Sequence, residues 1–277
     1  IESTFHFLRE TDSCQFYLSI SDLIFSVFDK CDDSVQKVAL RAFCELPVID
    51  DDERISVTKQ LSTVISAFGD KITDFDGDLA NQLICFTDKR IKNDKIDLKE
   101  IIRPLFSVQE QFNGACLLAC RYELVHDFSN FIFPENVTDK SQALSAYYSI
   151  EYLNSHQKIS ENIISSNSIK TFLSAASIQN NDDDFELKIS KTFDILINNF
   201  EFNNVVKVIF DNILLLLNSK MIDKIIDIFM KFCKEKDSSF SSIQKVSDEE
   251  FIEKIFPFMM KFSISPVESQ FYISYIF

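Results

Sequence analysis

The feature that most constrains this chain is a stripe of apolar residues spaced as on one face of an α-helix. In the segment 32–47 (DDSVQKVALRAFCELP) the stripe consists of Val35, Val38, Ala39, Ala42, Phe43 and Leu46. These positions follow the spacing of a helix that buries one side. Asp33 or Ser34 is suited to cap the first turn, and Pro47 ends the helix. The segment predicts an amphipathic helix packed against other helices.

The same stripe returns in the second half of the chain. It recurs at 189–200, with Thr192 in one apolar place, at 222–233 and at 252–260, and the stripes start about thirty residues apart. Equal faces at similar intervals are typical of a helical solenoid, and the 32–47 segment resembles the second helix of a HEAT repeat. We predict an all-α fold, an α-solenoid of HEAT/ARM-like helical hairpins. Because the period is irregular, an irregular multi-helix bundle is the alternative.

Turn-forming residues are scarce, with 3 Gly and 5 Pro in 277 residues. Sheet-rich folds use many Gly and Pro in their turns, so this scarcity also favours helices. Helix breaks are expected at Pro104 and Pro134, and Gly69 is expected to be a helix C-cap.

Two polar segments, Ser165–Ser168 and Gln179–Asp184, are expected to be loops. The first predicts a hinge between two helical halves, 1–165 and 166–277.

The formal net charge of −15 limits the kinds of partner. Such a chain repels phosphate backbones, and its densest basic stretch, Lys89–Lys92 with Lys95, is short and flanked by acids, so no direct nucleic-acid binding is expected. The acidity suits a basic protein partner, or it only keeps the chain in solution. No membrane partner is expected either, because charged and polar residues interrupt the most apolar run, 205–217.

The 7 Cys are odd in number and scattered among apolar helix positions, which predicts reduced core thiols in a cytosolic or nuclear protein. Cys116 and Cys120 lie on one helical face, with His126 nearby, and are the best candidates for a nucleophile or a metal ligand. Their apolar neighbours favour two buried structural thiols instead.

Other catalytic and metal-binding patterns are incomplete. The glycines are isolated from one another, whereas a phosphate-binding loop needs them clustered. Asp74, Asp76 and Asp78 are spaced like the start of a calcium loop. However, Leu79 and Cys85 stand where that loop needs Gly and Glu. A solvated acidic turn is expected, and no catalytic residue, metal site or cofactor is predicted.

Five segments resemble the apoptosis inhibitor 5 family in their order and separation: DDSVQKVALRAF (32–43), LFS (105–107), PENVT (134–138), LINNFEFNNVVKVIFDNIL (196–214) and SPVESQFYISYIF (265–277). The resemblance covers nearly the whole chain. It implies a HEAT-like half, 1–165, followed by an ARM-like half, 166–277. It also implies a nuclear, non-enzymatic scaffold that promotes cell survival by binding other proteins.

The resemblance further implies a partner-binding residue. Members of the family bind a basic growth factor through acidic surface residues, and Glu135 matches one of these positions. Asn136 stands where the family has a second acid. Asn199 stands near the place of a lysine that the family acetylates, so that regulation is not expected here.

These observations predict a protein–protein interaction scaffold that is not an enzyme and acts in the nucleus or, alternatively, the cytoplasm. A karyopherin-like or coat-type transport adaptor is the alternative, because such adaptors are also helical-repeat proteins. An enzyme using Cys116 or His126 is a third possibility. Resistance of both thiols to alkylation would leave that enzyme without a nucleophile.

Overall fold

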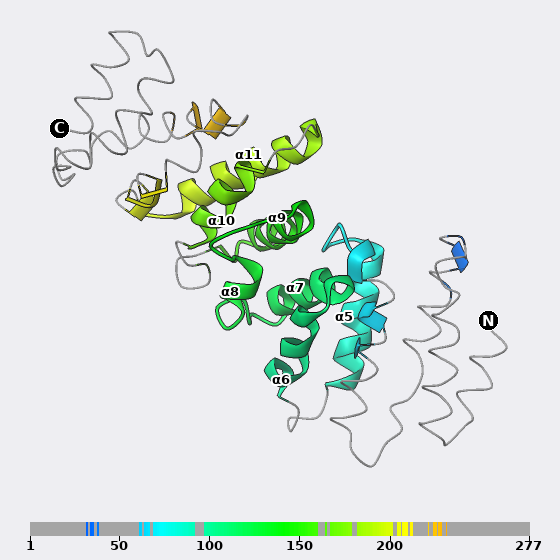
Figure 1. The fold of residues 1–277 in the computed structure, drawn as a ribbon. Coiled ribbons are helices and arrows are strands. Elements are labelled where there is room, and N and C mark those ends of the chain that lie inside the picture. The colour runs from blue at the N-terminus through cyan, green and yellow to red at the C-terminus, as the bar shows by residue number, and fades with distance from the viewer. Residues whose placement is uncertain are drawn as a thin grey trace, which may run out of the picture. The chain divides into compact units, whose positions relative to one another are not determined.

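The structure is a computed structural model, and the regular elements that it describes are all helices (Figure 1). The longest described stretches are 61–91 (except 63, 67 and 68), 97–159, 167–178 and 182–201. Residue 164 is also described, as are single residues and short runs within 32–38 and 204–231. Among these residues none lies in a strand, which confirms the predicted all-α class for the described part of the chain.

The chain divides into two compact units, 1–128 and 129–277. The sequence predicts a boundary between residues 165 and 166, which would fall within the second unit. Neither residue is among those described, so this boundary stays a prediction. Ser168, which the sequence placed in a hinge, lies instead in the helix α10 (Asn167–Ala176) and is fully buried. The hinge prediction is therefore wrong for Ser168, because a small hydroxyl residue fits inside a tightly packed helix.

The described part of the first unit is a series of short helices, one of which ends at a break that the sequence predicts. Its described elements are η2 (Gly69–Lys71), α5 (Asp78–Arg90), α6 (Leu98–Ile102), η3 (Arg103–Ser107), η4 (Gln109–Gln111) and α7 (Phe112–Arg121). Asp97 caps α6 by accepting a hydrogen bond of 2.9 Å from the Lys99 amide. Pro104 lies in the first turn of η3, where its missing N–H ends the α-helical pattern of α6 as predicted.

The core of the first unit is built around α7, which packs against η2, η3 and α5. Every residue of Gly114–Cys120 is buried. Gly114 lets Ile65 approach the α7 backbone, and Gly69 lets the Glu110 carbonyl approach so closely that a Cβ on either glycine would collide. Gly69 does not have positive φ and begins η2, so the predicted C-cap is wrong. Close packing, rather than backbone conformation, accounts for a glycine there.

The two longest described helices of the second unit, α9 and α11, have carboxylate caps. Its described elements are α8 (Ser129–Ile132), α9 (Lys140–Ser155), α10 (Asn167–Ala176) and α11 (Asp183–Asn199). Pro134 follows α8, as predicted. Asp139 caps α9 through the Gln142 amide at 2.9 Å, and Asp182 caps α11 through the Asp184 and Phe185 amides at 3.0 and 3.3 Å. The predicted loop 179–184 therefore ends at Asp182, because this side chain starts the helix.

The apolar face predicted for 189–200 is confirmed in α11 and in Phe200, the residue just after it. Its members are all buried: Ile189, Thr192, Phe193, Leu196, Ile197 and Phe200. The Thr192 hydroxyl donates a hydrogen bond of 2.8 Å to the Lys188 carbonyl one turn earlier. This bond satisfies the hydroxyl inside the core, which explains how Thr occupies an apolar place in the stripe.

Helices α9 and α11 are in contact and parallel, although α10 separates them in the sequence. Lys140 at the start of α9 pairs with Asp182 at the start of α11, and Glu151 farther along α9 pairs with Lys191 farther along α11. The contacts advance together along both helices, as parallel axes require. Figure 1 shows α9, α10 and α11 close together within this unit, and each of the three contacts the other two.

Most of the first predicted helix, 32–47, lies outside the described residues, as does the face at 252–260. The Asp32 carboxylate caps the described turn, since it accepts from the Val35 amide at 2.9 Å, and the predicted cap Asp33 lies outside the described residues. Val38 is 41% exposed, so its predicted place on a buried face is wrong. Of the face at 222–233 only Ile225 is described on the apolar side, and it is buried. In the described part of the chain, no helix combines the length and apolarity needed to cross a bilayer.

Candidate functional site

The residues considered for nucleophilic chemistry differ in their exposure to solvent. Cys116 and Cys120 lie in α7 with 0% exposure, as predicted for structural thiols. His126 lies beyond the end of α7 and is exposed. A catalytic nucleophile must contact both a general base and its substrate. The two thiols are enclosed in the core, where a substrate in solution does not reach them. Among the described residues there is also no group of three or more His, Cys, Asp or Glu placed to hold a metal ion.

The acidic turn before α5 points its first carboxylate at its own backbone. Asp74 accepts a hydrogen bond of 3.0 Å from the Asp76 amide, and its carbonyl accepts one of 3.1 Å from the Gly77 amide. Asp74, Asp76 and Asp78 are all exposed. This is the solvated acidic turn that the sequence predicts, and it forms the connection that leads into α5.

Glu135, the predicted partner-binding residue, lies on the exposed connection between α8 and α9. Its side chain is 60% exposed and pairs with Lys170 of α10 at 3.3 Å. Thr171 donates to the Pro134 carbonyl at 2.8 Å, and the Val137 amide donates to the Ser174 hydroxyl at 3.0 Å. These bonds attach the connection to one side of α10, so Glu135 is presented to solvent from a fixed backbone.

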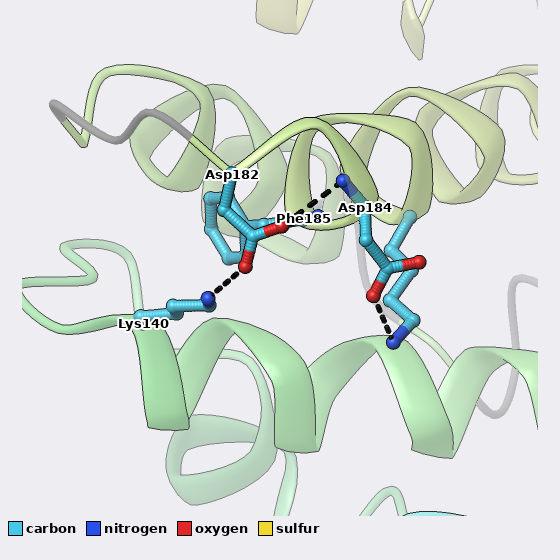
Figure 2. Close-up of polar contacts among 5 residues, drawn as sticks. Lys140, Asp182, Asp184 and Phe185 are labelled. Atoms are coloured by element: carbon cyan, nitrogen blue, oxygen red, sulfur yellow. Dashed lines mark hydrogen bonds and ion pairs between the residues drawn. The ribbon is translucent and has the colours of Figure 1, made fainter.

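A polar cluster that the sequence did not predict joins the starts of α9 and α11 (Figure 2). We call it the α9–α11 cluster, and it consists of Lys140, Tyr147, Tyr148, Glu151, Asp182, Asp184, Phe185, Lys188 and Lys191. In Figure 2, Lys140 reaches from α9 to Asp182, the residue that caps α11. The ammonium of Lys140 also lies 5.6 Å from the centre of the Phe185 ring, a cation–π distance.

Farther along the two helices, the cluster continues with aromatic rings and a second ion pair. Lys188 pairs with Asp184 at 2.7 Å and lies over the rings of Tyr147 and Tyr148, at 5.8 and 5.9 Å. One turn later, Lys191 of α11 pairs with Glu151 of α9 at 2.7 Å. The cluster thus connects the two helices at three successive levels.

The electrostatics of the carboxylates and amines favour their charged forms. Hydrogen bonds from Lys140 and from backbone amides lower the pKa of Asp182, and the hydrogen bond to Asp184 raises the pKa of Lys188. Burial acts to raise the pKa of Glu151, but hydrogen bonds from Lys191 and Tyr147 outweigh it, so that pKa is lowered.

The tyrosines of the cluster are held in their neutral form. Burial raises the pKa of Tyr147, and its hydrogen bond to Glu151 raises it further. Burial also raises the pKa of Tyr148. At neutral pH these phenols are protonated while Glu151, Asp182 and Lys188 are ionised. The arrangement therefore holds two helices together rather than moving protons, since general acid–base catalysis needs a pKa near the working pH.

A smaller polar contact connects α5 and α7 in the first unit. The Tyr122 hydroxyl, just beyond α7, donates a hydrogen bond of 2.6 Å to Asp88 of α5. Burial, followed by the bond to Asp88, raises the pKa of Tyr122. Asp88 is exposed, so this contact, like those of the α9–α11 cluster, holds two helices together at the surface of its unit.

The sequence contains one signal for the α9–α11 cluster. Asp182 precedes the apolar stripe of α11, as N-cap residues do, although the polar run Asp182–Asp184 also predicts a loop. Nothing in the sequence shows that Lys140, 42 residues away, is its partner. Comparisons of the chain with protein-family models, curated proteins and solved structures find no match.

Proposed function

We propose that the chain is a non-enzymatic protein–protein interaction scaffold built from HEAT/ARM-type helical repeats. The observation that carries this proposal is the contact of α9 with α11 in parallel, one helix apart in the sequence. In a repeat array the equivalent helices of successive repeats lie side by side in the same direction. An up-and-down bundle places antiparallel helices next to each other in sequence and in space.

The sequence separation of the charged pairs supports the same proposal. Lys140 and Asp182 are 42 residues apart, and Glu151 and Lys191 are 40 apart. HEAT and armadillo repeats are about 40–47 residues long. A contact repeated at this interval is expected if α9 and α11 are equivalent helices.

The next interval along the chain carries a similar contact. Glu186 of α11 pairs with Lys224 at 2.9 Å, and the two residues are 38 apart. Lys224 is itself helical. Each of these pairs joins an acid on one helix to a lysine on another helix about one repeat away.

The proposed partner is a protein with a basic surface. The chain carries a net charge of −15, and Glu135 presents a carboxylate on a connection fixed to α10. Unlike charges speed the encounter of two proteins, and apolar anchors then supply most of the affinity. Following the resemblance to the apoptosis inhibitor 5 family, we propose a nuclear role in cell survival for this scaffold.

Binding to a defined basic probe tests the proposal. The probe is a synthetic Lys/Arg-rich peptide, with a Glu-rich peptide of equal length for comparison, and affinity is measured by fluorescence anisotropy at increasing salt. We expect the basic peptide alone to bind, with affinity falling as salt rises through about 0.1 M, where the Debye length is about 10 Å. Salt-independent binding, or equal binding of the acidic peptide, contradicts the proposal.

A matched pair of variants tests the role of Glu135. Glu135→Gln removes one exposed charge, and Glu110→Gln removes another from η4 in the first unit. We expect Glu135→Gln to weaken binding by about two- to fivefold, the range for one exposed ion pair, and Glu110→Gln to leave it unchanged. Equal effects of the two variants would mean that Glu135 has no particular role.

A further inference from the structure

We propose that the first turn of α11 opens and closes under the control of a charge on α9. Lys140 holds the carboxylate of Asp182, and the first turn of α11 depends on that carboxylate. Screening or neutralising the pair would release this turn while the rest of α11 stays folded. The proposal concerns the second unit by itself and does not depend on whether the chain binds a partner.

The two oxygens of Asp182 have separate roles. Oδ1 accepts hydrogen bonds from the Asp184 and Phe185 amides, at 3.0 and 3.3 Å, and so caps the helix. Oδ2 accepts the hydrogen bond from Lys140 Nζ. A carboxylate held at one oxygen by a side chain of α9 is oriented to present the other oxygen to the amides of α11. The cap is therefore coupled to the contact between the helices.

The contact is open to ions from solution. The side chains of Lys140 and Asp182 are 42% and 38% exposed. Exposed ion pairs are screened by salt, whereas buried apolar contacts are not weakened in this way. Salt is therefore expected to act on the pair and its dependent turn before it acts on the packing of the helix.

The opening is expected to stop after one turn, because stronger contacts follow. Lys188 lies over the rings of Tyr147 and Tyr148 on α9. Ile189 and Phe193 have 0% exposure. Local opening in proteins costs least where few apolar contacts are buried. Phe185 of the first turn is itself only 1% exposed, so the opening releases the cap hydrogen bonds without taking this ring out of the core, and the buried residues that follow hold the remainder of the helix.

Amide hydrogen exchange of the full chain tests the proposal. The Asp184 and Phe185 amides report the cap, and the Phe193 amide reports the body of α11. Between about 0.02 M and about 1 M sodium chloride, we expect exchange at the two cap amides to accelerate by at most about fivefold, with Phe193 unchanged. No acceleration at the cap amides, or equal acceleration at Phe193, would overturn the proposal.

Two variants separate the ion pair from the cap. In Lys140→Met we expect exchange at low salt to equal the high-salt rate of the original chain and to lose its salt response. Asp182→Ser keeps an N-cap acceptor and leaves Lys140 over Phe185, but removes the ion pair, so its cap amides should also ignore salt. If either folded variant keeps the original salt response, the proposal is wrong.

A control variant shows that the effect belongs to this pair. Lys99→Met removes an exposed pair with Asp127, at 2.8 Å, in the first unit. It should leave exchange at Asp184 and Phe185 and its salt response unchanged. A changed response in this control would assign the effect to overall charge and would contradict the proposed mechanism. Circular dichroism establishes whether each variant is folded. If Lys140→Met does not fold, Asp182→Ser alone decides the question.

Discussion

At the scale of single residues, Glu151 shows how opposing effects determine the charge of a side chain. Burial alone would favour its neutral form, because a carboxylate loses hydration when it is enclosed. Lys191 at 2.7 Å and the hydroxyl of Tyr147 supply hydrogen bonds to the ionised form, and these prevail. The pKa of Glu151 is therefore lowered, and folding is linked to its ionisation.

The linkage gives a pH prediction with a definite sign. A group whose pKa is lower in the folded state adds stability above its unfolded value, near 4.5 for Glu151, and loses it as pH falls through the folded value. Glu151→Gln should therefore lower the free energy of unfolding at neutral pH by less than about 1 kcal/mol, since the exposed pair is screened by solvent. Urea unfolding at neutral pH and in acid measures this difference.

The control for this prediction is Lys158→Gln, which changes a charge just beyond the end of α9 outside the α9–α11 cluster. The difference in stability between Glu151→Gln and the original chain should shrink as the solution becomes more acidic than the ordinary pKa of a glutamate. A difference that stays constant with pH would mean that Glu151 contributes only through packing.

Residue-scale predictions failed for two reasons: a contact with residues distant in sequence, and the choice among adjacent polar residues. Gly69 was expected to cap a helix, whereas the structure uses it to admit the Glu110 carbonyl. Asp33 and Ser34 were the expected caps, but the Asp32 carboxylate accepts from the Val35 amide. Several adjacent polar residues can cap one turn, so composition gives the place of a cap to within a residue or two.

At the scale of elements, the sequence predicts a helix well when it buries one side. In α11 the apolar stripe coincides with the buried side of the helix. The match is clear because the opposite side of the helix carries charged residues such as Lys191. By contrast, α9 buries nearly all of Ala143–Leu153 and has no clear stripe. Periodicity cannot identify the face of a helix that is enclosed on several sides. This is why the contact between α9 and α11 could not be predicted.

Helix α7 gives a direct test of burial through cysteine chemistry. Cys116 and Cys120 have 0% exposure, whereas Cys85 on α5 is exposed. An alkylating agent needs access to the thiolate, so Cys85 should react within minutes while Cys116 and Cys120 react only after unfolding. Mass spectrometry of digested protein, treated with iodoacetamide with and without urea, measures each site.

Cys85 serves as the internal control for the reagent in the same sample. Rapid labelling of Cys116 or Cys120 in the folded chain would contradict their burial. It would also restore the hypothesis of a cysteine nucleophile in α7, since an accessible thiol is the first requirement for that chemistry.

At the scale of the whole molecule, the sequence predicts the helical class but not the arrangement of the candidate site. The small number of glycines and prolines, together with the repeated apolar stripes, was sufficient to predict an all-α fold. Glu135 was found through a family resemblance, but its partner Lys170, 35 residues later, was not. Ion pairs between helices depend on which helices are neighbours, and a single sequence does not contain that information directly.

A repeat array and a single-core bundle respond differently to a cavity. Phe193 of α11 has 0% exposure, and Phe193→Ala should cost about 3–5 kcal/mol locally. In a repeat array each repeat contacts only its neighbours, so stability is lost mainly there. Native-state hydrogen exchange should therefore show reduced protection in α9, α10 and α11, with the amide of Leu117 in α7 keeping its protection.

The reciprocal variant completes this test. Phe86 of α5 is equally buried, and Phe86→Ala should reduce the protection of Leu117 while leaving α9 and α11 unchanged. A single-core bundle unfolds as one cooperative unit, so either substitution would then lower the protection of the most stable amides in both units by the same free energy. Equal losses in both units would contradict the repeat architecture, and with it the physical basis for proposing a scaffold. Losses confined to the substituted unit would support a chain whose parts respond separately to what binds each of them.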